Sequence, residues 1–175
     1  MFMRAAAHII GPLDGPGAAL GDLARSLGFA SVASFSGVGS AEAQTQQTPL
    51  IYFLFAATDD VATLKPVADA IRFAPSRRIR FSPMVYFAES PSMEAIRTCT
   101  AMGFDDVITL PFTPKRVRER LKRLVDRMQV YHETASYLGP DRGHRVSPER
   151  RLRRLEIIRS ATVGVSVMRD EMQAH

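Results

Sequence analysis

The chain has 175 residues, 46% of them apolar, which is enough for one sizeable core and an extension. Its single cysteine, Cys99, excludes an intramolecular disulfide and a cysteine-based zinc site, and the four histidines show no metal-ligand spacing, so we expect no metal and no cofactor. The first apolar run is too short for a signal peptide or a membrane span, and we expect a cytoplasmic protein without membrane contact.

The net charge of +5 is placed unevenly. Residues 1–100 hold eight basic and eight acidic side chains, whereas residues 101–175 hold fifteen basic and ten acidic ones. A positive C-terminal part can attract nucleic acid, acidic protein or an anionic nucleotide, although basic runs are also common on solvated helix faces.

Short apolar runs alternate with amphipathic segments along the first 131 residues. The runs predict buried strands at 5–10, 29–35, 50–56, 84–88 and 106–110, with 50–56 as the central strand because all seven of its residues are apolar. The predicted helices cover 18–28, a short irregular stretch within 36–48, 58–73 with Pro66 in its first turn, 91–102 with Ser90 as its cap, and 115–131. Residues 74–83 read as a loop.

This alternation predicts an α/β domain over residues 1–131, with a doubly wound five-stranded parallel sheet and helices on both faces. Residues 132–175 are expected to form a basic, mainly helical C-terminal extension. Ser147 and Pro148 suggest a helix start, and Leu152, Leu155 and Ile158 form one apolar stripe. The valines at 163, 165 and 167 alternate as in a strand, so the structure beyond Gly164 stays open.

The segment GFDDVITLPF, residues 103–112, resembles the end of the receiver domain of two-component response regulators. SLGF after the first predicted helix and SPMVYFAES at the fourth strand agree, so the resemblance covers about residues 5–130 and implies a flavodoxin/receiver-like sheet. Receivers are phosphorylated on an aspartate at the end of the third strand. An acidic pair after the first strand holds Mg²⁺, and a Ser or Thr and a Lys after the fourth and fifth strands contact the phosphoryl oxygens.

None of these positions carries the residue type that phosphorylation requires in this chain. The acceptor position falls on Phe55, with Ala56 no better, and the hydroxyl and lysine positions become Ala88 and Leu110. Gly11, Pro12 and Leu13 stand at the acidic pair, with only Asp14 nearby. The resemblance therefore implies a degenerate receiver, or pseudo-receiver.

We expect Leu110 to pack near Phe55 and Ala88 as an apolar plug, because a lone buried ammonium would cost several kcal/mol. Asp59 or Asp60 is a less favoured displaced acceptor, since a carboxylate in a first helical turn more often caps the helix. Asp105 and Asp106 are expected to be structural.

Three function classes remain. The favoured one is a phosphorylation-independent module of bacterial signal transduction that binds another signalling protein or a second copy of itself as a homodimer. The alternative is a receptor for an anionic ligand such as a cyclic dinucleotide, clamped by the arginines of RRIR and RRLRR. Nucleic-acid binding comes last because no helix-turn-helix or aromatic platform is recognisable. The expected interaction surface comprises Val107, Lys115, Arg118, Arg123, Arg150, Arg151, Arg153 and Arg154.

Catalysis is not expected, because Ser36, Ser90 and the histidines form no readable nucleophile–base arrangement and no Walker loop is present. The stretch YLGPDRGHR resembles a Tyr-Phe-Gly-Pro-Asp-Arg tail of receiver-like proteins of proteobacteria. We expect it to form a turn at 139–141 that is anchored on the domain by Tyr137 and Arg142.

Overall fold

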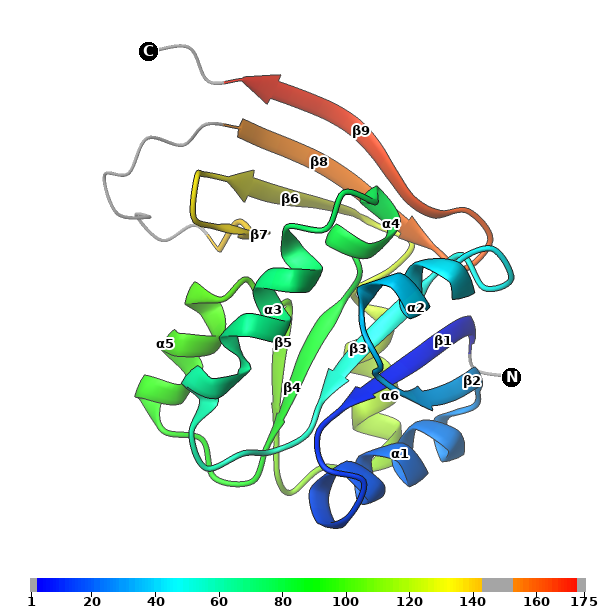
Figure 1. The fold of residues 1–175 in the computed structure, drawn as a ribbon, viewed down its shortest axis with the longest axis vertical. Coiled ribbons are helices and arrows are strands. Elements are labelled where there is room, and N and C mark those ends of the chain that lie inside the picture. The colour runs from blue at the N-terminus through cyan, green and yellow to red at the C-terminus, as the bar shows by residue number, and fades with distance from the viewer. Residues whose placement is uncertain (1–2, 143–152, 173–175) are drawn as a thin grey trace.

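The computed structural model describes residues 3–142 and 153–172, which form two sheets (Figure 1). The first is a five-stranded parallel sheet of order β2-β1-β3-β4-β5, and the second is a four-stranded antiparallel sheet of order β7-β6-β8-β9. The order 2-1-3-4-5 is that of flavodoxin-like and receiver-like folds. The prediction of a doubly wound parallel sheet is therefore confirmed.

The parallel strands follow the apolar runs closely. Each continuous apolar stretch became a strand because helices cover both of its faces. The strands are β1 Met3–Ile10, β2 Phe29–Ser34, β3 Ile51–Phe55, β4 Met84–Ala88 and β5 Asp106–Thr109. The helices between and after them are α1 Gly15–Leu27, α2 Val38–Gln44, the 3₁₀ turn η1 Val61–Leu64, α3 Lys65–Arg72, α4 Arg77–Arg80, α5 Met93–Ala101 and α6 Pro114–Lys122.

Two apolar cores lie on the two faces of the parallel sheet. Leu20 and Leu27 of α1 and Leu121 of α6 contribute to one core, while α2, α3 and α5 cover the other. Strand β3 is buried along its whole length and supplies both cores, as expected for the central strand. No helix among the described residues is long and apolar enough to cross a bilayer.

Several helix boundaries differ from the prediction. The expected loop at 74–83 contains the one-turn helix α4, and Pro66 lies in the first turn of α3, as predicted, behind a separate η1. Helix α5 is capped by Ser92 rather than Ser90, since the Ser92 hydroxyl accepts a hydrogen bond from the Ala95 N–H at 3.0 Å. Helix α6 ends at Lys122 instead of Tyr131, and Met128 is 55% exposed at the start of a strand.

The expectation of a helical extension is wrong. The described part of the C-terminal region is the antiparallel sheet of β6 Met128–Glu133, β7 Leu138–Pro140, β8 Arg153–Ser160 and β9 Gly164–Met172. Along β8, Leu155, Ile157 and Arg159 are buried while the residues between them are half-exposed, which is the period of a strand. Ser147 and Pro148, where the helix start was predicted, lie outside the described residues.

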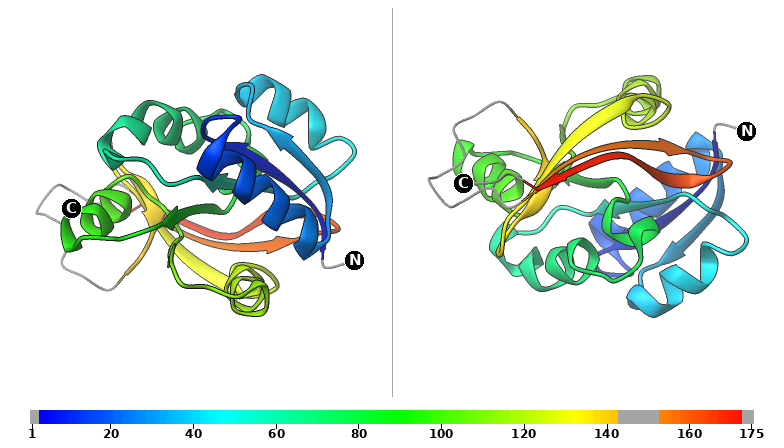
Figure 2. Two further views of the ribbon diagram at one scale, coloured as in Figure 1. Left: turned by 90° about the horizontal axis from the view of Figure 1, so that it is seen from below. Right: turned by 90° about the horizontal axis from the view of Figure 1, so that it is seen from above.

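The antiparallel sheet covers the amino ends of the parallel strands (Figure 2, right). Phe81, in the turn before β4, packs against Tyr131 of β6 with ring centroids 5.6 Å apart. Its carbonyl oxygen accepts a hydrogen bond from Arg159 Nε at 2.6 Å. The carboxyl ends of the parallel strands lie at the opposite side of the molecule (Figure 1).

A buried ionic cluster joins the two sheets. The Asp105 side chain, just before β5, is 1% exposed and accepts hydrogen bonds from Arg72 of α3 at 2.7 Å and from Arg159 of β8 at 2.8 Å. The Tyr131 hydroxyl and the Met84 N–H, the latter at 2.8 Å, also donate to this carboxylate. Burial raises the pKa of Asp105, but the guanidiniums of Arg159 and Arg72 outweigh burial and hold the pKa below its usual value.

Two glycines allow the YLGPDR stretch to pack against the turn that precedes β5. Gly103 has φ +82°, and a Cβ on it would lie 2.2 Å from the Leu138 carbonyl oxygen. A Cβ on Gly139 would lie 2.7 Å from the Gly103 Cα. The backbones therefore touch at a distance that only glycines permit.

Arg142 fastens this contact. Its Nη2 donates hydrogen bonds to the carbonyl oxygens of Phe104 at 2.7 Å and Asp105 at 2.9 Å. The predicted anchoring role of Arg142 is confirmed. The predicted turn is corrected in part, because Gly139 and Pro140 belong to β7 and pair with β6.

Candidate functional site

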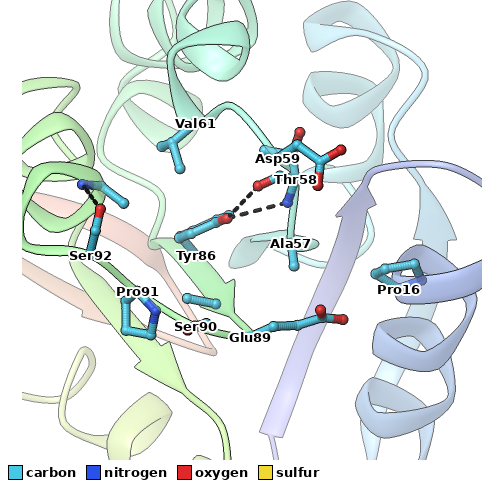
Figure 3. A pocket seen from close by; sticks show the side chains of 12 residues that line it. Pro16, Ala57, Thr58, Asp59, Val61, Tyr86, Glu89, Ser90, Pro91 and Ser92 are labelled. Carbon is cyan, nitrogen blue, oxygen red and sulfur yellow. Dashed lines mark hydrogen bonds between the residues drawn. The ribbon is translucent and has the colours of Figure 1, made fainter.

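A cavity lies at the carboxyl ends of β3 and β4, where open parallel sheets bind ligands. It is a polar cleft of about 340 Å³ between the loops that follow these strands (Figure 3). In Figure 3, Asp59 lies on one rim and Glu89 on the opposite one. The cleft is lined by Pro16, Ala57, Thr58, Asp59, Val61, Tyr86, Ala88, Glu89, Ser90, Pro91, Ser92 and Ala95.

An apolar pocket of about 210 Å³ adjoins the polar cleft. The two cavities share Pro16, Ala57, Ala88 and Glu89, so they form one recess, which we call the carboxyl-edge recess. Its apolar end lies between α1 and the loop after β5. That end is lined by Pro16, Ala19, Leu20, Leu23, Ala56, Ala57, Phe87, Ala88, Glu89, Leu110 and Phe112.

The structure separates the residues that the sequence placed in one degenerate pocket. Phe55 belongs to the core on the opposite sheet face, with its ring centroid 4.7 Å from that of Phe104, and lines neither cavity of the recess. Its neighbour Ala56 borders the recess instead, together with Ala88 and Leu110. Ala56 therefore stands at the end of β3 where the recess begins.

Leu110 is not the buried plug that we expected. Its side chain is 46% exposed at the rim of the apolar pocket, and the peptide bond to Pro111 is cis. The burial cost of an ammonium therefore does not explain why this position lacks lysine. Leu110 instead supplies exposed hydrocarbon at the rim of the recess.

The loop after β1 leaves no room for an acidic side chain at Gly11. Gly11 has φ +152°, and a Cβ there would lie 2.8 Å from the Ala56 Cβ. Pro12 and Leu13 line a separate cavity of about 170 Å³, and Leu13 is 81% exposed. Asp14 stands at the cap position of α1 but makes no capping hydrogen bond through its side chain. The loop thus approaches β3 too closely for a metal-binding pair at Gly11.

Three of the four segments at the carboxyl edge carry acidic side chains, and none of the four carries a basic one. Segments 11–16, 56–61, 89–94 and 110–114 contain no Lys, Arg or His. Within residues 3–142 and 153–172, the structure shows no ion pair to any of their carboxylates. These segments hold five carboxylates, namely Asp14, Asp59, Asp60 and Glu89 outside the helices and Glu94 in the first turn of α5.

Asp60, next to the polar cleft, and Tyr86, in its lining, each make a local hydrogen bond. Asp60 caps η1 by accepting a hydrogen bond from the Ala62 N–H at 3.0 Å, as expected for a carboxylate in a first turn. The Tyr86 hydroxyl accepts a hydrogen bond from the Thr58 N–H at 3.3 Å. Burial raises the pKa of Tyr86, so the hydroxyl stays protonated at neutral pH.

The expected interaction surface is dispersed. Val107 is half-buried against the core under α5, and Lys115 and Arg123 are exposed on α6 and just after it. Arg118 is half-buried on α6. Arg150 and Arg151 lie outside the described residues.

Three of the arginines that were expected to clamp phosphates, Arg80, Arg153 and Arg154, pair with carboxylates within the protein. Arg153 binds Asp170 through two hydrogen bonds of 2.6 and 2.8 Å. Arg154 binds Glu156 at 2.6 Å, while Arg80 of α4 binds Glu133 at 2.9 Å. These carboxylates compete with any anionic ligand for the same guanidiniums.

Sequence reasoning missed the acidic rim and the position of Glu89 between the two cavities. The signal was present, because four segments that follow parallel strands all lack Lys, Arg and His while the whole chain has a net charge of +5. Among the described residues, no group of three or more His, Cys, Asp or Glu side chains is arranged to hold a metal ion.

No family model matches the sequence, and no curated protein matches it. Among solved structures, a protein from Chloroflexus aurantiacus described as a response regulator is 16% identical, with a TM-score of 0.48 over 68% of this chain and 95% of that chain. A pilus assembly-related protein from Burkholderia pseudomallei is 17% identical, with a TM-score of 0.49 over 71% and 92%. A receiver domain protein from Methanospirillum hungatei is 18% identical, with a TM-score of 0.43 over 68% and 91%. These similarities concern the fold alone.

Proposed function

We propose that the protein is a phosphorylation-independent receiver-like module that acts in signal transduction by binding another protein. The observation that carries this proposal is the contact between Gly11 and Ala56, which brings the loop after β1 against the end of β3. In a phosphorylated receiver, carboxylates and a divalent cation would occupy this place.

The chemistry of aspartyl phosphorylation explains why these substitutions matter. A carboxylate nucleophile needs a cation to gather the anionic phosphoryl oxygens and a second positive group to neutralise developing charge. The recess offers Ala56 at the end of β3, Ala88 at the end of β4 and Leu110 after β5. None of these side chains can attack phosphorus, ligate Mg²⁺ or donate a hydrogen bond.

The proposal is tested by incubating the protein with acetyl phosphate and Mg²⁺ and measuring its intact mass. We expect no mass increase, whereas an acid-labile adduct of one phosphoryl group would contradict the proposal. Asp59→Asn is the informative variant, because Asp59 lines the cleft and is the nearest candidate for a displaced acceptor. An adduct that disappears in this variant would identify Asp59 as that acceptor.

A further inference from the structure

We propose that the carboxyl-edge recess binds a cationic amphipathic segment of a partner protein. A Lys or Arg side chain of that segment enters the polar cleft between Asp59 and Glu89, and a neighbouring apolar side chain enters the pocket beside Leu110. This inference rests on the proposed function, since it assigns a partner chemistry to the same module.

The apolar end of the recess provides a place for hydrocarbon. Its walls come from α1, β4 and the loop after β5, and Leu20, Leu23 and Phe112 supply most of its bulk. Leu110, 46% exposed, adds apolar surface at the rim. Covering such surface on binding stabilises a complex, in opposition to the cost of ordering the partner.

The charge of the rim selects the partner. Asp59 and Glu89 line the recess, and segments 11–16, 56–61, 89–94 and 110–114 around it contain no Lys, Arg or His, although the protein as a whole carries +5. A cation that approaches this edge therefore meets unneutralised acidic groups, while phosphate or nucleic acid is repelled. Charge complementarity with an apolar neighbour is the combination that a basic amphipathic segment offers.

The two cavities are close enough to be occupied by one segment. Glu89 and Ala57 line both of them, so a single short stretch of chain passes from one to the other. Figure 3 shows Glu89 and Asp59 on opposite sides of the polar cleft, with Ala57 between them. An entering ammonium or guanidinium can therefore approach carboxylates from two loops.

The test measures the binding of a short fluorescent helix-forming peptide of leucine and lysine by anisotropy at low salt. The test variant is Asp59→Asn/Glu89→Gln. The matched control Glu119→Gln/Glu171→Gln removes the same charge from α6 and β9. A third variant, Leu110→Lys, places a cation on the rim without burying it. A peptide with glutamate in place of lysine is the second control.

We expect the test variant to bind the lysine peptide about fivefold or more weakly, Leu110→Lys to weaken binding as well, and the matched control to change it by less than about twofold. The glutamate peptide should not bind. The inference would be overturned if the lysine peptide showed no saturable binding, or if the test variant bound it as tightly as the wild type does. It would also be overturned if the glutamate peptide bound as tightly as the lysine peptide, or if sedimentation showed that a second copy of the chain occupies the recess. The acetyl phosphate assay on the same variants reports on the proposed function separately.

Discussion

Two adjacent aspartates, Asp105 and Asp106, allow a direct test of the cluster that joins the two sheets. Asp105 is buried between two guanidiniums, whereas Asp106 pairs with Arg120 in a half-exposed position, with side-chain exposures of 20% and 31%. Replacing each by asparagine removes one negative charge and keeps the shape of the side chain. The two variants differ in how far the remaining guanidiniums are separated from water and in their number, which is two at Asp105 and one at Asp106.

The expected magnitudes follow from burial. In Asp105→Asn, Arg72 and Arg159 stay buried without a carboxylate, and breaking a buried pair in this way costs about 3–5 kcal/mol of unfolding free energy. For a chain of this length that corresponds to a fall in Tm on the order of 10 °C. In Asp106→Asn, Arg120 can turn to solvent, and the cost should be about 0–1 kcal/mol.

Urea denaturation followed by circular dichroism measures both variants against the wild type. The reasoning is refuted if Asp105→Asn costs less than about 1 kcal/mol or if the two variants lose the same stability. A changed denaturant slope in Asp105→Asn alone would indicate that the antiparallel sheet has separated from the parallel one. Near-ultraviolet spectra report on the buried Tyr131 and distinguish that case.

Three further predictions concern acid, backbone contact and thiol reactivity. Folding lowers the pKa of Asp105, so its stabilising contribution is complete above the unfolded value of 3.8 and is lost as the pH falls through the lower folded value. In denaturation curves, the difference in unfolding free energy between wild type and Asp105→Asn should be constant near neutral pH and shrink below about pH 4. A constant difference at acid pH would contradict this. Gly103→Ala should lower the free energy of unfolding by about 2 kcal/mol or more, because the added Cβ would meet the Leu138 carbonyl oxygen. A Cβ on Gly39 of α2 would have no atom within 4 Å, so Gly39→Ala should be neutral or slightly stabilising in thermal denaturation. Similar losses in both variants would exclude the backbone contact as the cause. Burial raises the pKa of Cys99 to about 11, so Ellman's reagent should react only on unfolding, and rapid reaction of the native thiol at pH 8 would show that the core opens there.

The parallel sheet could be predicted from the sequence because its signal is local. Strand β4 coincides with the predicted run 84–88, and β3 differs from its predicted run by one residue at each end. Continuous apolar runs leave little choice of structure when helices must cover both faces. The sheet order then follows from the family resemblance.

The antiparallel sheet could not be predicted because one of the buried positions of β8 is occupied by a charged residue, Arg159. Arg159 faces inward in β8, so the alternation of buried residues in that strand is interrupted by a charge in the sequence. Its burial is possible only because Asp105, 54 residues earlier, supplies the opposite charge. A pairing over that distance leaves no periodic pattern, whereas Leu152, Leu155 and Ile158 offered a helical one.

The recess was predicted in composition but not in shape. The loss of acidic, hydroxyl and ammonium groups could be read position by position, yet the exposure of Leu110 depends on the path of the loop after β5. The closeness of Gly11 to Ala56 likewise depends on two loops that are far apart in the sequence. Such contacts are properties of tertiary structure.

The way the second sheet covers the first has a practical consequence for recombinant fragments. A fragment that stopped at Tyr131, where the alternation of strands and helices ends, would lack Leu138, Leu155 and Ile157, which share an apolar cluster with Phe81. It would also deprive Asp105 of Arg159, one of its two arginines. It would retain every element of the parallel sheet and still expose part of its core to water. Expression vectors for this protein should therefore carry the chain through β9, and a shorter product should be expected to aggregate.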